Sequence, residues 1–334
     1  MERLGITVGM EGASLGDALE NARRAESLGY TDAWTAEVAG PDGLTPLAVL
    51  AAMTDRLRLG TAILPVFTRP PALMAMGAAA LADLSRGRFV LGLGTSSDVI
   101  IERWMGLGFD RPLTRMREYV AVLRSAFAGD KVSYAGRTVE VSDFRLQHDP
   151  KATIPIYLAA LGPKACRLAG EVADGVALFL KTPVGVRRAL QLVAEGAGKA
   201  GRDLRGFEAI IRLPVIMGGD ERATAMLARR TIVAYAVVDV YNRSLADQGY
   251  AEEARAIAAA WASGDRKGAV AAVSDRMVED LVIIGGPRDC RSKIEAFRKA
   301  GIGTPILLPM SAAKDPGEAA AQIEETTEAL APTR

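Results

Sequence analysis

The order of apolar and polar positions along the chain predicts strands that alternate with amphipathic helices. Two runs, Arg58 to Leu64 and Phe89 to Leu93, are apolar enough to form strands buried on both faces. Between them Pro71 can begin a helix. Apolar and small residues then recur at helical spacing, at Leu73, Met74, Gly77, Leu81 and Leu84. We therefore predict parallel strands joined by a right-handed crossover.

The same alternation continues over the whole chain. Further strands are predicted at Gly5 to Met10, Asp32 to Thr35, Ile154 to Ala160, Val176 to Leu180, Phe207 to Ile216 and Thr304 to Pro309. Helical patterns separate them; Ser14 is the predicted N-cap of the first helix, and Pro46 and Pro287 begin two others. With the two strands above, this order predicts an α/β fold, a (β/α)8 TIM barrel.

Two stretches are predicted to lie outside the barrel. Residues 131–141 alternate around Ala135, Gly136 and Arg137, which predicts a small hairpin within an insertion of about 131–150. Residues 220–280 are helical in pattern and too long for one crossover, which predicts a helical insertion after the seventh strand. Because no linker interrupts the pattern, we expect residues 1–334 to form a single domain.

Composition narrows the class of protein. Of the 334 residues 49% are hydrophobic, and 41 basic against 40 acidic residues give a net charge of +1. This balance favours neither nucleic acid nor an anionic membrane as a partner, and no stretch reaches the roughly 20 apolar residues of a membrane span. Cys166 and Cys290 lack metal-ligand spacing, so we predict no metal site and no disulfide. We expect a soluble, cytoplasmic protein whose ligand is a small molecule.

The predicted carboxyl ends of the strands are the place to look for a ligand site. These ends are Ala62 to Val66 and Gly94 to Ser97, and the small residues in them let the backbone approach a flat ligand. At Gly162-Pro163 a helix begins, so that free N–H groups and the positive end of the helix dipole point to one place. The GLG run at 92–94 lacks the spacing of a dinucleotide fingerprint, and we reject a nucleotide-binding fold.

Six segments, which together span nearly the whole predicted barrel, carry a family resemblance. They are Glu26 to Glu37, Thr54 to Ala75, Gly87 to Ser97, Ile154 to Lys164, Gly170 to Val176 and Val282 to Ile302. In this order they resemble the bacterial luciferase-like superfamily of flavin and deazaflavin enzymes. Within it, the chain looks most like the actinobacterial branch that uses coenzyme F420.

The resemblance implies a set of cofactor-binding residues. It places a non-proline cis peptide at Ala62-Ile63, behind the central ring of the cofactor, and the cofactor phosphate near Leu161 and Gly162. Lys181 would add a positive charge for the phosphate or for an acidic cofactor tail. The full predicted set is Thr35, Ala62, Ile63, Gly94, Thr95, Ser96, Ala160, Leu161, Gly162 and Lys181. The plainer alternatives are a trans strand end, ordinary turn residues, a helix start and a solvated lysine.

Glu37 is the candidate catalytic residue. It ends the second strand, and related deazaflavin enzymes often carry an acid there that is followed by a histidine, whereas Val38 follows here. The single histidine, His148, lies in a polar loop where we expect it to be exposed. Glu37 would then donate or accept a proton, with hydrogen-bonding help from Thr35, Thr95 and Ser97. The alternative is a capping or ion-paired structural carboxylate.

Charged and aromatic residues beside the strand ends have less specific roles. Glu102, Arg103 and Trp104 form a lid in one interpretation; in the other, which we favour, Trp104 packs on the barrel rim and the charges are solvated. For Arg69, Arg86 and Arg88 we expect exposed structural positions.

The function that follows from the resemblance is hydride transfer between coenzyme F420 and a small organic substrate. The alternatives are an FMN-dependent monooxygenase that uses dioxygen, and a non-catalytic barrel or accessory subunit. We expect a narrow, uncharged slot at the barrel mouth to hold the ring. Related enzymes are commonly dimers, so we also expect a homodimer that meets through Ala48, Leu50, Ala51, Met74, Met76 and Ala78.

Overall fold

The fold is the predicted barrel. The computed structural model describes residues 2–9, 14–149 and 151–332. In this part of the chain, eight parallel strands close into a ring in which each strand pairs with the next and the last with the first. In ring order they are β1 (Gly5–Thr7), β2 (Asp32–Thr35), β3 (Arg58–Thr61), β5 (Phe89–Gly94), β8 (Ile156–Ala159), β9 (Gly175–Phe179), β10 (Glu208–Ile216) and β12 (Thr304–Met310).

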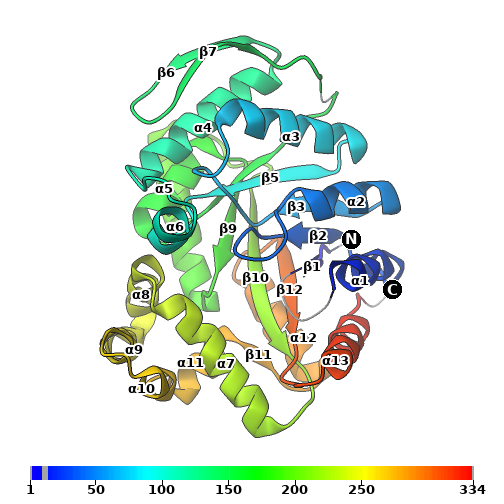
Figure 1. Ribbon diagram of the computed structural model, residues 1–334, viewed down its shortest axis with the longest axis vertical. Coiled ribbons are helices and arrows are strands. Elements are labelled where there is room, and N and C mark those ends of the chain that lie inside the picture. The colour runs from blue at the N-terminus through cyan, green and yellow to red at the C-terminus, as the bar shows by residue number, and fades with distance from the viewer. Residues whose placement is uncertain (1, 10–13, 150, 333–334) are drawn as a thin grey trace.

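Helices form the outer layer of the barrel, as Figure 1 shows. They are α1 (Leu15–Ser27), α2 (Thr45–Met53), α3 (Pro71–Leu84), α4 (Pro112–Phe127), α5 (Pro163–Val172), α6 (Pro183–Lys199), α12 (Pro287–Lys299) and α13 (Pro316–Ala329). Ser14 caps α1 by accepting the Asp17 N–H at 3.1 Å, as predicted. Proline stands in the first turn of most of the others, where its fixed φ favours helix entry.

Two predicted strands end earlier than expected. The run Arg58 to Leu64 divides into β3 and β4 (Leu64–Pro65), because the chain turns at Ala62 and Ile63, which join neither strand. The strand expected at Gly5 to Met10 ends at Thr7, and Met10 lies outside the described residues. A short strand, β11 (Ile283–Ile284), pairs with the carboxyl end of β10 and was not predicted as a strand.

Both insertions are present. The hairpin consists of β6 (Lys131–Ala135) and β7 (Glu140–Arg145), which pair antiparallel, and it lies along α4 (Figure 1). The helical insertion lies on the opposite side of the barrel and packs on the ends of β9, β10 and β12. It comprises α7 (Glu221–Ala236), α8 (Asp239–Leu245), the π-helix η2 (Ala246–Tyr250), α9 (Ala251–Ala262), α10 (Arg266–Ala271) and α11 (Asp275–Leu281).

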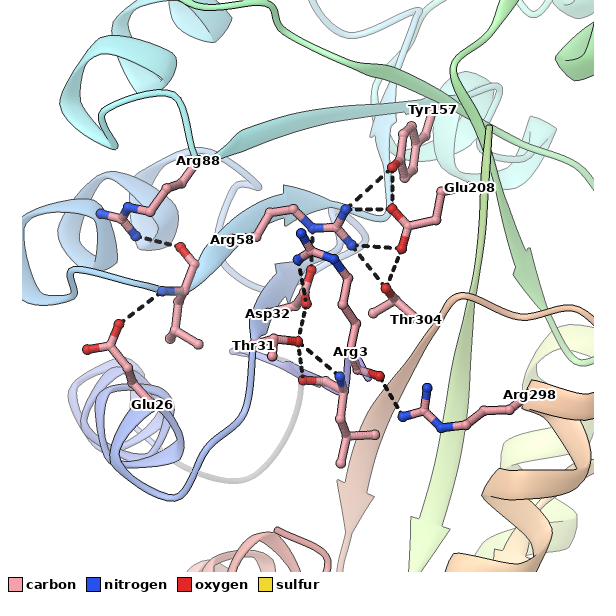
Figure 2. Close-up of polar contacts among 12 residues, drawn as sticks. Arg3, Glu26, Thr31, Asp32, Arg58, Arg88, Tyr157, Glu208, Arg298 and Thr304 are labelled. Atoms are coloured by element: carbon pink, nitrogen blue, oxygen red, sulfur yellow. Dashed lines mark hydrogen bonds and ion pairs between the residues drawn. The ribbon is translucent and has the colours of Figure 1, made fainter. Parts of the chain in front are cut away.

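The amino end of the barrel is closed by a buried ion network (Figure 2). Arg58, the first residue of β3, pairs with Asp32 at the start of β2 and with Glu208 at the start of β10, where the Nη1–Oε2 distance is 2.5 Å. Thr304 and Tyr157 donate to the Glu208 carboxylate as well. Burial would raise the pKa of Glu208, but Arg58 and the two hydroxyls outweigh it and lower the pKa to about 2. This end of the barrel is therefore built for stability.

Above this network the barrel interior is filled by side chains. Trp34 is fully buried there and packs with residues of the other strands, among them Val90, Ile210 and Ile306. Its ring leaves no room at Gly60 on the neighbouring β3, where a Cβ would lie 2.2 Å from the Trp34 ring. The layer supports the carboxyl end of the barrel, where Ala62 and Ile63 pack against it.

The expected dimer patch is wrong in most of its residues. Leu50, Ala51, Met74 and Ala78 are buried in the core of this chain, because they form the inner faces of α2 and α3. The large apolar residues that these two neighbouring helices expose are Val49, Met53, Leu73, Met76 and Leu84, of which only Met76 was predicted. Among the described helices, none combines the length and apolar character of a membrane span.

Candidate active site

The carboxyl ends of β2, β3 and β5 meet in one place. The Thr35 carbonyl accepts the Ala62 N–H at 2.6 Å, and the Ile63 carbonyl accepts the Glu37 N–H at 3.2 Å. Thr35 is buried, and its hydroxyl donates to the Gly43 carbonyl at 2.7 Å. These contacts bring together Thr35, Glu37, Ala62 and Ile63, as the sequence predicts.

The peptide bond between Ala62 and Ile63 is cis, which confirms what the resemblance implied. Both residues are partly exposed, whereas Gly94 beside them is buried at the end of β5. A Cβ at Gly94 would lie 2.7 Å from Ile63 Cγ1 and 3.1 Å from Ala159 Cβ. Glycine is therefore required at this position if Ile63 is to keep its place at the barrel mouth.

The Glu37 carboxylate lies in a half-buried ion pair. It accepts a hydrogen bond from Arg69 Nη1 at 2.7 Å and another from the Gly43 N–H at 3.0 Å. The hydrogen bond and charge of Glu37 raise the pKa of Arg69. The expectation of an exposed Arg69 is wrong, because this ion pair holds it against the strand ends. Glu37 thus reaches the barrel mouth and also ties the loop after β2 to the segment before α3.

A second group of predicted residues lies where β8 leads into α5. Ala160 is buried, and Gly162 is the N-cap residue of α5 with no side-chain cap. The first four N–H positions of a helix lack intrahelical acceptors, and Pro163 has no N–H, so Lys164 and Ala165 keep free donors here. A Cβ at Gly162 would meet no atom within 4 Å. An open, uncapped helix start of this kind suits a phosphate.

Lys181 is buried, so the alternative of a solvated lysine is wrong. Its Nζ donates to the Leu161 carbonyl at 2.8 Å and to Ser244 Oγ at 2.6 Å. Burial lowers the pKa of this ammonium group. Gln248 of η2 adds hydrogen bonds to Leu180 and Thr182. Lys181 therefore fastens the loop before α5 to the helical insertion, a role that the sequence did not predict.

The loop after β5 is partly exposed. Thr95 and Ser96 are partly exposed, and Ser96 adopts a φ of 60°. Ser97 is buried and its Oγ accepts the Ile100 N–H at 3.3 Å, just before the π-helix η1 (Val99–Trp104), whose N-cap residue is Asp98. Trp104 is 55% exposed, so the expectation that it packs on the barrel rim is wrong.

The only histidine of the chain lies away from these groups. His148 is half exposed, with Nε2 3.3 Å from Asp83, as expected. Arg88 was expected to be exposed, and this is wrong. It is partly buried, because its guanidinium donates to the carbonyls of Leu57 and Thr54. Arg86 is exposed, as predicted.

The barrel mouth is not uncharged, which corrects the expected slot. Arg212 of β10 is buried, with Nη1 3.4 Å from the Ala62 carbonyl oxygen. Its guanidinium stacks on the Phe179 ring, 4.7 Å from the centroid. Sequence reasoning missed Arg212, although a lone arginine in the otherwise apolar run Ile210 to Ile216 was a usable signal. Among the described residues, no cluster of His, Cys, Asp or Glu is arranged to hold a metal ion.

Comparison with known proteins shows the family of the chain. A family model described as luciferase-like monooxygenase matches residues 3–304. A protein of Mycobacterium tuberculosis, whose name provisionally assigns it as a coenzyme F420-dependent oxidoreductase, is 30% identical over 93% of this chain and 96% of its own. The 5,10-methylenetetrahydromethanopterin reductase of Methanolobus tindarius is 32% identical over 85% of this chain and 89% of its own.

Solved structures share the fold. The coenzyme F420-dependent tetrahydromethanopterin reductase of Methanopyrus kandleri superposes with a TM-score of 0.78 over 99% of this chain and 97% of its own, at 24% identity. The barrel, the contacts at its mouth and the match over most of the chain lead to one assignment: this chain belongs to the luciferase-like monooxygenase family.

Proposed function

We propose that this protein is an F420-dependent oxidoreductase that transfers a hydride between the deazaflavin and a small organic substrate. The observation that carries the proposal is the arrangement at the barrel mouth, where the partly exposed Ala62 and Ile63 lie at the end of β3 and Ile63 packs over the buried Gly94. The names of relatives that are similar over most of the chain support the choice of cofactor. A deazaflavin supplies two-electron hydride chemistry at one ring carbon and does not activate dioxygen.

The residues present fit such a cofactor. Gly94 lets the partly exposed Ile63 keep its place at the barrel mouth, where a flat ring would lie, and Thr95 and Ser96 offer polar groups at the same edge. At the next strand along the ring, α5 begins directly after Leu161 and Gly162, and its open start offers the N–H groups of Lys164 and Ala165 to a phosphate. Lys181 holds that loop in place from below, through the Leu161 carbonyl.

The chain's own part in the reaction is to position the reactants and to move a proton. We assign proton exchange with the substrate to Glu37, which follows β2, donates its backbone N–H to the Ile63 carbonyl and pairs its carboxylate with Arg69. Arg69 and the Gly43 N–H fix its orientation. The Arg212 guanidinium keeps a positive charge next to Ala62, where it would favour electron-rich groups of a bound ring.

The family match favours a second candidate, a monooxygenase, because the description of the family names that activity; FMN would be its cofactor. Titration of the purified protein with F420 and with FMN, followed by the fluorescence of each, separates the two. We expect saturable binding of F420 and weaker binding of FMN. Tight FMN binding with no response to F420 would overturn the proposal, and binding of neither would favour a non-catalytic barrel.

We also propose that the protein is a homodimer. The exposed apolar residues of α2 and α3 named above form one surface on two adjacent helices, which a second copy of the chain would cover.

A further inference from the structure

An open cleft of about 680 Å³ lies on the outer side of the barrel. It is formed by α4, by α5 and by the tip of the hairpin β6–β7, which lies along α4 in Figure 1. Its lining includes four cationic side chains and two carboxylates. The cations are Arg117, Arg137, Lys164 and Arg167, and the carboxylates are Glu118 and Glu171. The cleft thus carries excess positive charge in a chain whose net charge is only +1.

The two carboxylates are already engaged. Glu118 is buried and accepts the N–H groups of Arg137 and Thr138, at 2.7 and 2.9 Å, so it holds the hairpin tip on α4. Glu171 pairs with Arg117. Within the described residues, the side chains of Arg137 and Lys164 make no ion pair to a carboxylate. These two cations are the ones left to attract an anion from solution.

The position of Lys164 connects the cleft to the candidate active site. Lys164 is the second residue of α5, directly after the helix start where we place the cofactor phosphate. Lys164 and Arg137 of the hairpin both line the cleft, so a chain that leaves the phosphate toward this side would enter a surface that carries both charges. The hairpin is an insertion outside the barrel, so the barrel itself does not require it.

We propose that this cleft binds the acidic tail of the deazaflavin cofactor, a flexible chain of carboxylate groups beyond the phosphate. The inference rests on the proposed function. An open, charged cleft attracts such a chain through screened electrostatics and needs no fixed geometry. The hairpin tip, which Glu118 holds in place, would then serve cofactor binding.

The test measures the affinity for F420 with a single glutamate in its tail and for F420 with a long tail, by fluorescence titration. The variants are Arg137→Glu alone and Arg137→Glu together with Lys164→Glu. The matched control replaces two exposed cations of the helical insertion, Arg230→Glu with Lys267→Glu, which changes the net charge by the same amount.

For the wild type we expect the long tail to bind roughly 3- to 10-fold more tightly than the short one at low salt, and the preference to shrink as salt is raised. Arg137→Glu should reduce the preference and the double variant should abolish it, while the control keeps it. A wild type that binds both forms equally, or variants that keep the preference, would overturn the inference while leaving the proposed function intact. Failure of the wild type to bind F420 of either length would overturn the proposed function itself.

Discussion

The Glu37 carboxylate accepts hydrogen bonds from Arg69, from the Gly43 N–H and from the Thr68 hydroxyl, and its role can be tested at the scale of one side chain. Glu37→Gln keeps an acceptor for the Gly43 N–H but removes the charge and the basic oxygen. We expect oxidation of reduced F420 by a panel of small carbonyl and alkene compounds to slow by about 100-fold, with F420 affinity changed less than about threefold. Arg69→Gln is the control, because it breaks the ion pair and leaves the carboxylate. Equal losses of rate in both variants would show that Glu37 acts only through the ion pair.

Glu208 sets a pH dependence of stability. Its pKa is lowered from 4.5 to about 2 in the folded chain, so its charged form contributes up to about 3 kcal/mol above pH 4.5. That contribution is lost as the pH falls from about 4.5 toward 2. Glu208→Gln should therefore lower the melting temperature at pH 7 and have a smaller effect at pH 3. Glu325→Gln, on the exposed face of α13, is the control. A constant difference between wild type and Glu208→Gln at both pH values would contradict this account.

At the scale of elements, Lys181 joins the loop between β8 and α5 to the helical insertion. Lys181→Met leaves the Leu161 carbonyl and Ser244 without their donor, at a cost of about 1–3 kcal/mol for each buried group left unsatisfied. We expect faster amide hydrogen exchange in residues 161–162 and 244–248 together with weaker F420 binding. Ser244→Ala, which removes one of the two acceptors, should show a smaller effect. Weaker binding with unchanged exchange would mean that Lys181 contacts the cofactor directly.

Elements were predictable where one local signal defines them. Apolar runs predicted the barrel strands, and Pro71, Pro163 and Pro287 marked helix starts. The break in the third strand left no mark on the apolar pattern, and only the family resemblance predicted the cis bond at Ala62-Ile63. Arg69, Lys181 and Arg212 were misjudged or missed because their partners lie on other strands or helices, and these meet only when the barrel closes.

At the scale of the whole molecule, the apolar side chains that α2 and α3 expose would form the interface of the proposed dimer. Charged substitutions among them should therefore separate the two copies. Leu73 and Met76 are each about half exposed, at 51% and 53%. Leu73→Glu with Met76→Glu should turn a dimer into a monomer in analytical ultracentrifugation, because burying two carboxylates in an interface is unfavourable. Val184→Glu, at an exposed position of α6, should leave the dimer intact. A wild-type chain that is monomeric at all concentrations would refute the dimer.

The most direct test of the central claim is a crystal structure of the protein with F420 bound. We expect the deazaflavin ring to lie across the carboxyl end of the barrel, in contact with Ala62, Ile63 and Gly94. We expect the phosphate to lie at the start of α5. A ring bound elsewhere on the chain, or a barrel mouth that side chains close against the ring, would contradict it.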